Sequence, residues 1–336
     1  MILGLGLILA GAHFLVEGSS SIARRFGISD FIIGMTIVGI GTSAPEMAIS
    51  FLSAFKGNAD IAVGNVLGSN IFNTLVILGV TGLIAPIALT SNNIKKDIPF
   101  SLLAAVILLT LGSSVWLDGT TGNVISRVSG IMLLSFFGVF MSYSIFSAKS
   151  TGGSAMSAGG AKECASMDVD GVKNESSSNI SGKEKSIIVC IIMVIGGLAA
   201  LVFGGDMFVN SAAVIAKKLG VSDAVIALTL MAGGTSLPEL ASCVVAAYKK
   251  NTAMALGNVI GSNVSNIFLI LGGSAVINPL SMSNISIIDT GTLAISSLLV
   301  FIAAFTFKKK QIDRVESALF ILIYIVYLYT VIGIKS

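Results

Sequence analysis

The sequence of 336 residues is 54% hydrophobic and only 11% charged, with a mean hydropathy of +0.95 and a formal net charge of +3. Soluble globular domains carry about 25% charged residues, so this composition excludes an ordinary soluble protein. The small net charge gives no reason to expect a nucleic acid as partner, and we expect the chain to be surrounded by a lipid bilayer.

Helices that cross a bilayer need about 20 apolar residues each. The sequence offers ten such stretches, which predict an all-α polytopic membrane protein with ten transmembrane helices. The ten expected spans are 2–22, 28–54, 59–85, 97–117, 123–146, 186–216, 221–247, 252–278, 286–307 and 314–334.

The first expected span begins without a basic n-region, which indicates a retained helix and not a removable signal peptide. It ends in the basic pair Arg24 and Arg25 followed by Gly27, a pattern typical of a helix C-terminus. Ser29 or Asp30 then caps the second span, with the acid at the favourable end of the helix dipole.

The second span contains Gly-Ile-Gly-Thr-Ser-Ala-Pro-Glu at residues 39–46. Pro45 has no amide hydrogen, so we expect the helix to break there. Thr42 and Ser43 precede Glu46 by four and three residues and can share one helical face with it. A charged side chain at the centre of a bilayer costs roughly 2.5–3.5 kcal/mol, so Glu46 indicates a path for an ion or a substrate.

A purely structural interpretation of this motif is also available. The proline could only kink the helix, the hydroxyls could bond back to their own backbone, and Glu46 could pair with a basic residue. No Lys or Arg lies in the middle of any expected span, which favours the ion site.

The third span contains Gly-Asn-Val-Leu-Gly-Ser-Asn at residues 64–70, followed by Asn73. Ser69 and Asn73 are four residues apart and can present neutral oxygens on one helix face, where hard cations such as calcium or sodium take oxygen ligands. The alternative is a helix-packing seam of small residues. We favour packing for Asn65 and ligation for Asn73.

The same motifs occur again in the second half of the chain. Ala-Gly-Gly-Thr-Ser-Leu-Pro-Glu at residues 232–239 begins 193 residues after the motif at 39–46, and Gly-Asn-Val-Ile-Gly-Ser-Asn at 257–263 follows 64–70 by the same offset. Five expected spans in each half make an odd number, so the halves enter the membrane in opposite directions as inverted repeats. The duplicated polar residues are Thr235, Ser236, Glu239, Ser262 and Asn266. For Asn258 we again favour packing.

The chain therefore divides into an N-terminal repeat at 1–148 (motif region 39–73), a linker at 149–184 rich in Gly and Ser, and a C-terminal repeat at 185–336 (motif region 232–266). The linker composition predicts a flexible segment. Most Lys and Arg residues fall in the linker and in alternate loops, so the positive-inside rule predicts that both termini lie outside and the linker is cytoplasmic in a cell membrane.

The paired Gly-Thr-Ser-x-Pro-Glu motifs, each followed by Gly-Asn-Val-x-Gly-Ser-Asn, resemble the two alpha repeats of the calcium/cation antiporter superfamily, and especially its prokaryotic sodium/calcium exchangers. The resemblance implies a ten-helix fold with a central diamond of cation sites, across which the first and sixth helices slide. Carried over residue by residue, it implies ligands at Glu46, Glu239, Thr42, Ser43, Thr235, Ser236, Ser69, Ser262, Asn73 and Asn266.

Together these features predict a secondary active antiporter that moves calcium or competing sodium ions between Glu46 and Glu239 by alternating access, with no cofactor. Exchange of calcium or another divalent cation for protons is the alternative, because a desolvated Glu can take a proton. A passive cation channel is a rival from another class. No paired nucleophile and base is visible, so we do not expect an enzyme.

The family's sodium/calcium exchangers often carry an acid at one of the two Asn positions, whereas Asn73 and Asn266 are both neutral here. Two carboxylates balance one calcium ion or two monovalent ions, so we hypothesise electroneutral or altered-stoichiometry exchange. Potassium dependence is also in question. The expected bundle is large enough for a monomer to function alone.

Overall fold

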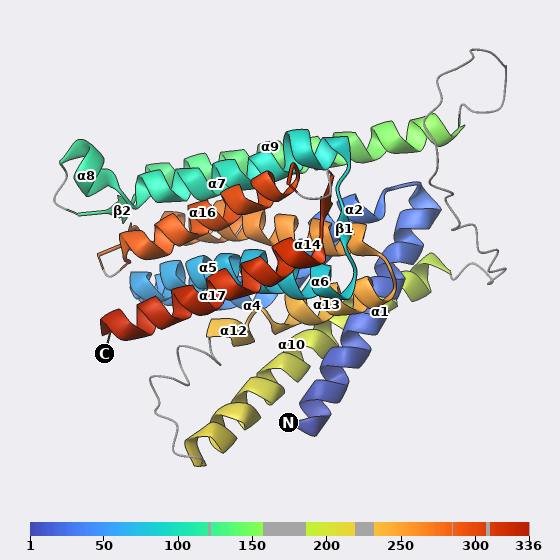
Figure 1. The fold of residues 1–336 in the computed structure, drawn as a ribbon, viewed down its shortest axis with the longest axis horizontal. Coiled ribbons are helices and arrows are strands. Elements are labelled where there is room, and N and C mark those ends of the chain that lie inside the picture. Colours follow the sequence, from blue (N-terminus) through green and yellow to red (C-terminus); the bar gives the residue numbers. More distant parts are fainter. Residues whose placement is uncertain (120–121, 157–185, 219–231, 284, 307–309, 336) are drawn as a thin grey trace.

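The computed structural model describes residues 1–119, 122–156, 186–218, 232–283, 285–306 and 310–335, which are almost entirely helical (Figure 1). The elements of the first half are α1 (Ile2–Phe26), α2 (Asp30–Ile33), η1 (Gly34–Val38), α3 (Gly39–Thr42), α4 (Ala44–Phe55), α5 (Ala59–Phe72), η2 (Asn73–Ile77), α6 (Leu78–Ile84), β1 (Ile87–Ala88), η3 (Asn93–Asp97), α7 (Ile98–Leu111), α8 (Ser114–Asp118), β2 (Val124–Ile125) and α9 (Arg127–Met156). The segments labelled η are π-helical.

The second half repeats most of this order. Its elements are α10 (Ile187–Lys218), α12 (Ala232–Gly234), α13 (Leu237–Tyr248), α14 (Thr252–Ser265), η5 (Asn266–Leu271), α15 (Gly272–Ile277), β3 (Leu280–Ser281), α16 (Ile287–Ala303), β4 (Gln311–Ile312) and α17 (Arg314–Lys335).

Six helices within the described residues are long and apolar enough to cross a membrane. They are Ile2–Phe26, Ala59–Ile84, Arg127–Ser147, Ile187–Lys218, Thr252–Ile277 and Arg314–Val331. The helices Asp30–Thr42 and Ala44–Phe55, bent by 46° at their break, make a seventh span if counted together.

Three further helices, α7, α13 and α16, fall on predicted spans but have only 14, 12 and 17 residues. A straight helix rises about 1.5 Å per residue, so these segments are shorter than the roughly 30 Å thickness of a hydrocarbon core. The protein is therefore a helical membrane protein, and the count of ten spans stays a prediction.

The predicted helix breaks are present. The chain leaves helical geometry at Ser43, between α3 and α4, and again between α12 and α13, where Pro238 occupies the first turn. Ser29 caps α2 as predicted, accepting a hydrogen bond from the Ile32 amide at 3.3 Å. Ser222 and Asp223, which follow Ser29 and Asp30 by 193 residues, lie outside the described residues.

Helix α9 continues through residue 156, beyond the predicted start of the linker at residue 149. The rest of the predicted linker, residues 157–184, lies outside the described residues, so its flexibility stays a prediction.

Two short antiparallel strand pairs, which the sequence did not reveal, join the halves. Strand β1 of the first half pairs with β4 of the second, and β2 of the first half pairs with β3 of the second. The register places Ile87 opposite Ile312 and Val124 opposite Ser281. Each two-stranded pair therefore contains one strand from each half, as expected for a duplicated chain.

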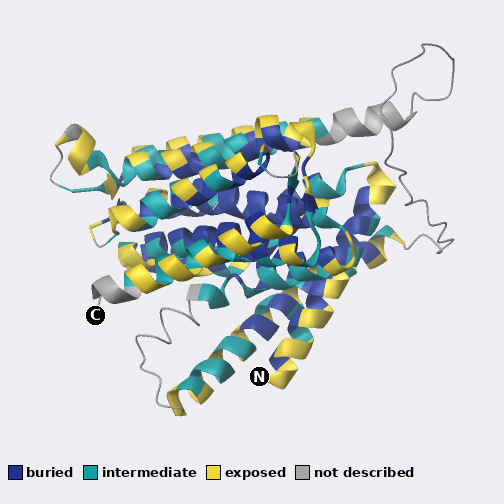
Figure 2. Ribbon diagram, viewed as in Figure 1, coloured by how far each residue is buried: buried dark blue, intermediate teal, exposed yellow. Residues whose placement is uncertain are grey.

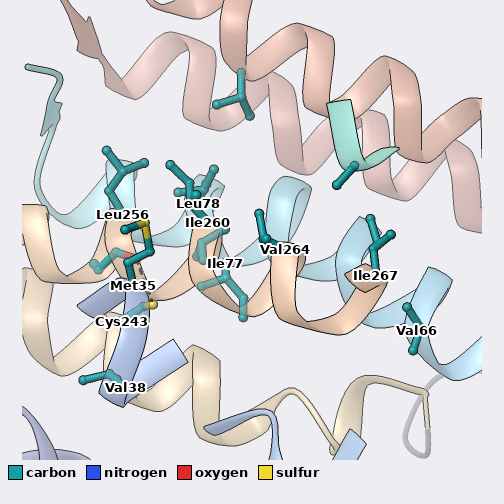
Figure 3. Packing of buried hydrophobic residues seen from close by; sticks show 14 of the residues in the cluster. Met35, Val38, Val66, Ile77, Leu78, Cys243, Leu256, Ile260, Val264 and Ile267 are labelled. Carbon is teal, nitrogen blue, oxygen red and sulfur yellow. Dashed lines mark hydrogen bonds between the residues drawn. The ribbon is translucent and has the colours of Figure 1, made fainter. Parts of the chain in front are cut away.

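Helices α5 and α14 form the buried centre, since 67% and 78% of the residues in their most apolar stretches are buried inside the protein. Figure 2 shows these central helices mostly in dark blue, with the exposed residues on the outer helices. Figure 3 shows the apolar packing around α14, with Leu256, Ile260, Val264 and Ile267 in a row along it.

Helices α1 and α10 form an antiparallel pair beside this bundle (Figure 1). Glycines let the two backbones come close: a methyl group on Gly11 would lie 2.7 Å from the Gly197 carbonyl oxygen, and one on Gly4 would lie 2.9 Å from the Gly204 carbonyl oxygen. Such small-residue contacts are common between membrane helices. The glycines therefore allow the two helix backbones to pack closely against each other.

Candidate functional site

The two helix breaks place the two predicted carboxylates. Glu46 lies in the first turn of α4 and Glu239 in the first turn of α13, each directly after the proline that starts the helix. The free amides of a helix N-terminus favour negative charge. Both side chains are fully buried, with 0% exposure, so each carboxylate depends on its immediate neighbours for solvation.

Each carboxylate accepts a hydrogen bond from the other half of the chain. Ser43 Oγ donates to Glu239 Oε1 at 3.0 Å, and Ser236 Oγ donates to Glu46 Oε1 at 2.9 Å. Ser69, on α5, donates to the same Glu46 oxygen at 3.3 Å. The structure therefore gathers these three hydroxyls and both carboxylates in one buried cluster.

Several oxygens of the predicted ligand set are buried without a hydrogen-bond partner among the described residues. They are Glu46 Oε2, Glu239 Oε2, Asn73 Oδ1, Asn266 Oδ1 and Thr235 Oγ1. A buried polar atom left without a partner costs about 1–3 kcal/mol, and more if it is charged. Carboxylate, amide and hydroxyl oxygens are the ligands that calcium and sodium take, so this donor set suits a hard cation.

The two Asn residues lie one helical turn beyond the two motif serines. Asn73 follows α5 four residues after Ser69, and Asn266 follows α14 four residues after Ser262. Each Asn opens a π-helical segment, η2 or η5. Single π turns inside α-helices are frequent at functional sites, and neither segment was predicted from the sequence.

Two of the predicted ligands donate their hydrogen bonds away from the carboxylates. Thr42 Oγ1 bonds to the Val38 carbonyl at 3.0 Å and to Asn258 Oδ1 at 3.2 Å. Ser262 Oγ bonds to the Gly39 carbonyl at 3.0 Å. The hydrogen bond from Ser69 to Glu46 therefore has no equivalent between Ser262 and Glu239, and the cluster is not fully symmetric.

Asn65 and Asn258 hold neighbouring helices together, in agreement with the packing interpretation. The Asn65 amide nitrogen donates to the Glu46 carbonyl oxygen at 3.2 Å and to Ser50 Oγ at 3.1 Å. The Asn258 nitrogen donates to Ser242 Oγ at 2.8 Å and to Cys243 Sγ at 3.2 Å.

A second polar network, which sequence reasoning missed, ties α5 to α14 beside the cluster. Asn70 Nδ2 donates to the Asn263 carbonyl oxygen at 3.2 Å, and Asn263 Nδ2 donates to Thr74 Oγ1 at 2.8 Å. Asn266 Nδ2 donates to Asn70 Oδ1 at 2.9 Å. The Asn that ends each Gly-Ser-Asn motif was the available signal for this network.

The charge of the cluster comes from two residues only. No group of three or more His, Cys, Asp or Glu that could hold a metal ion exists within the described ranges. The remaining oxygens come from neutral hydroxyls and amides. With both carboxylates ionised, the cluster would carry two negative charges.

Two broken helices, one from each half, that each bury a carboxylate bonded to a serine of the opposite half are typical of secondary membrane transporters. The chain belongs to the sodium/calcium exchanger family, whose sequence model, described as "Sodium/calcium exchanger protein", matches residues 1–146 and 189–333.

Individual relatives agree with this assignment. The chain is 34% identical to the putative antiporter CaxA of Alkalimonas amylolytica, covering 98% of this chain and 96% of the relative. It is 33% identical to the sodium/calcium exchanger MaX1 of Methanosarcina acetivorans, over 98% and 96%. Its fold matches a solved structure of the sodium-calcium exchanger NCX_Mj, soaked with 2.5 mM Na+ and 0.1 mM Ca2+, with a TM-score of 0.76 at 32% identity over 98% and 96% of the chains.

Proposed function

We propose that this protein is a secondary active antiporter that exchanges sodium for calcium at a single site between Glu46 and Glu239. The observation that carries the proposal is the state of the two carboxylates. Each commits Oε1 to a serine of the opposite half, while Oε2 is buried without a partner in the described structure. A bound cation would supply the missing partner of both Oε2 atoms. The names of MaX1 and NCX_Mj support sodium and calcium as the substrates.

The ligands in this proposal are the two carboxylates and the neutral oxygens around them. The neutral ligands are Thr42, Ser43, Ser69, Asn73, Thr235, Ser236, Ser262 and Asn266. Calcium and sodium both accept such oxygens, so the two ions compete for the same carboxylates. This competition couples the fluxes, because the site can leave one side of the membrane with calcium or with sodium but not with both.

The balance of charge sets the stoichiometry. Two carboxylates neutralise one calcium ion or two sodium ions, and both Asn corners are neutral. A third sodium ion would leave a net positive charge in a buried site, which is unfavourable at low dielectric. The proposed exchange is therefore electroneutral.

Alternating access requires the site to open to one side at a time. We assign the chain ten transmembrane helices in two inverted repeats of five, with both termini outside, residues 149–184 cytoplasmic, and a monomer as the working unit. In this scheme α1 and α10 slide across the bundle as the access switches. Their close, glycine-lined contact supports movement as one unit, since the two backbones approach closely at several points along the pair.

Uptake of calcium-45 into proteoliposomes loaded with sodium tests this function. The three conditions are an outward sodium gradient, a proton gradient and no gradient. The variants are Glu46→Gln and Glu239→Gln, with Asp60→Asn, an exposed acid at the start of α5, as the matched control. We expect uptake to need the sodium gradient, to vanish in both Glu variants and to persist in the control.

Each of the other outcomes would indicate a different function or substrate. Uptake that follows the proton gradient would make the protein a calcium/proton antiporter, and uptake that needs no counter-ion would make it a passive channel. Absence of any calcium flux would refute calcium as the substrate.

A further inference from the structure

A groove of about 340 Å³ opens between η3 and the segment that follows α16. We call it the lysine groove; its lining residues are Ser91, Ile94, Lys95, Ala304, Phe305 and Lys310. Phe305 is 58% exposed, whereas the apolar lining residues Ile94 and Ala304 are buried. The groove is therefore an apolar channel with two ammonium groups at its edge.

The two ammonium groups are not neutralised by the protein. Within the part of the chain that the structure describes, neither Lys95 nor Lys310 pairs with a carboxylate, and none of the lining residues is acidic. The neighbouring Lys96, by contrast, lies 5.6 Å from the centre of the Tyr143 ring. Two lysines without a carboxylate partner attract an anion. The groove therefore combines a site that attracts an anion with an apolar surface.

Lys310 is held in a strained backbone conformation. Its φ is +63°, a region that favours glycine and is uncommon for other residues. Its carbonyl accepts from the Leu89 amide at 2.8 Å and its amide donates to the Ala304 carbonyl at 3.0 Å, so both sides of the residue are fixed. Strain of this kind gathers at binding and functional sites. Glycine would relieve the strain at this position. The presence of a lysine instead indicates that its side chain has a function there.

The opposite face of the protein provides an internal comparison. There the Met282 amide donates to the Asn123 carbonyl at 2.8 Å, matching the bond from Leu89 to Lys310. Asn123 takes the place of Lys310, and its side chain accepts from the Val115 amide at 2.7 Å. Lys95 lies in η3, and the residue 193 positions later is Ile288, in α16. The repeat fold thus does not need these lysines, and they distinguish one face of the membrane protein from the other.

We propose that the lysine groove binds an anionic phospholipid, with the headgroup phosphate between Lys95 and Lys310 and an acyl chain along Phe305. Basic pockets between transmembrane helices bind acidic headgroups, and anionic lipids gather in the cytoplasmic leaflet. With both termini outside, the groove opens to that leaflet. The proposal is independent of which ions are exchanged.

Native mass spectrometry of the full chain in detergent tests the proposal, with phosphatidylglycerol and phosphatidylcholine as competing probes. The variants are Lys95→Gln and Lys310→Gly, the second of which keeps the left-handed backbone. Lys250→Gly is the matched control, because Lys250 also has a positive φ, of +60°, but does not line the groove.

We expect the native chain to retain phosphatidylglycerol in preference to phosphatidylcholine, and each groove variant to weaken this retention about fivefold. Lys250→Gly should bind like the native chain, and glycerol phosphate alone should not displace the lipid. If Lys95→Gln and Lys310→Gly both retained phosphatidylglycerol as well as the native chain does, the proposal would be overturned, as it would be by equal loss in the control. Displacement by glycerol phosphate would also overturn it, since the groove would then hold a free phosphate and not a lipid.

Discussion

Ser43 Oγ lies 3.0 Å from Glu239 Oε1, across the boundary between the two halves of the chain, and donates a hydrogen bond to it. The equivalent pair, Ser236 and Glu46, repeats this contact at 2.9 Å. Each carboxylate is thus oriented by the half to which it does not belong. A relative movement of the halves would alter both carboxylates at once, which is how one site could respond to the access state as a unit.

Replacing Ser43 by Ala should therefore weaken calcium binding. The loss removes a proposed ligand oxygen together with the hydrogen bond that orients Glu239, and loss of an orienting contact alone typically costs about 10- to 100-fold in metal affinity. Ser236→Ala should show a similar effect through Glu46. Calcium titration of purified protein measures it, with Ser135→Ala as control because the Ser135 hydroxyl only bonds back to Ile131 within α9. Native affinity in both Ser variants would contradict the orienting role.

Glu239→Gln should abolish the stabilisation of the protein by calcium without lowering the stability of the calcium-free protein. Calcium at about 100 times its Kd stabilises a binding protein by about 2.7 kcal/mol, so calcium should raise the melting temperature of the native chain. The variant should melt at or above the native temperature without calcium, because a buried charge that lacks a full set of partners has been removed. Calcium should not raise its melting temperature. A variant that calcium still stabilises as much as the native chain would place the cation elsewhere.

Gly11→Ala should disturb the contact between α1 and α10. The added methyl group would lie 2.7 Å from the Gly197 carbonyl oxygen, and overpacking of this kind costs about 1–3 kcal/mol. Gly6→Ala is the control, because a methyl group there meets nothing within 4 Å. We expect a lower melting temperature and slower exchange for Gly11→Ala alone. Equal behaviour of the two variants would show that the close backbone contact is not needed.

Asn266→Asp should add a third carboxylate to the site. Ligand charge is one of the factors that tune calcium affinity, so we expect tighter calcium binding, by on the order of tenfold. The extra charge also permits a third sodium ion, so exchange should become electrogenic. Current recordings on proteoliposomes measure this, with the native chain expected to exchange without current. An inward current accompanying calcium extrusion by the native chain would contradict electroneutral exchange.

Much of the site could be predicted because its residue types differ from those of the apolar sequence around them. Glu46 and Pro45 stand out in an apolar stretch, and Glu239 and Pro238 repeat them, so the breaks followed from elementary chemistry. The structure confirms the breaks and brings the carboxylates and serines together.

Features that depend on tertiary pairing could not be predicted in this way. Two-residue strands such as β1 and β4 carry too little sequence to show a pattern, and they exist because segments distant in the chain meet. The network of Asn70, Asn263 and Thr74 likewise depends on how α5 crosses α14. Apolar stretches also predicted span positions better than span lengths, because the π-helical segment η3, which directly precedes α7, could not be recognised from the sequence.

The most direct test of the central claim is the calcium affinity of the purified protein measured over a series of sodium concentrations. If calcium and two sodium ions share the carboxylates Glu46 and Glu239, the apparent Kd for calcium should rise with the square of the sodium concentration once sodium is in excess, and the dependence should disappear with potassium in place of sodium. A calcium Kd that does not change with sodium would mean that the ions do not share a site, and the proposed coupling would be wrong.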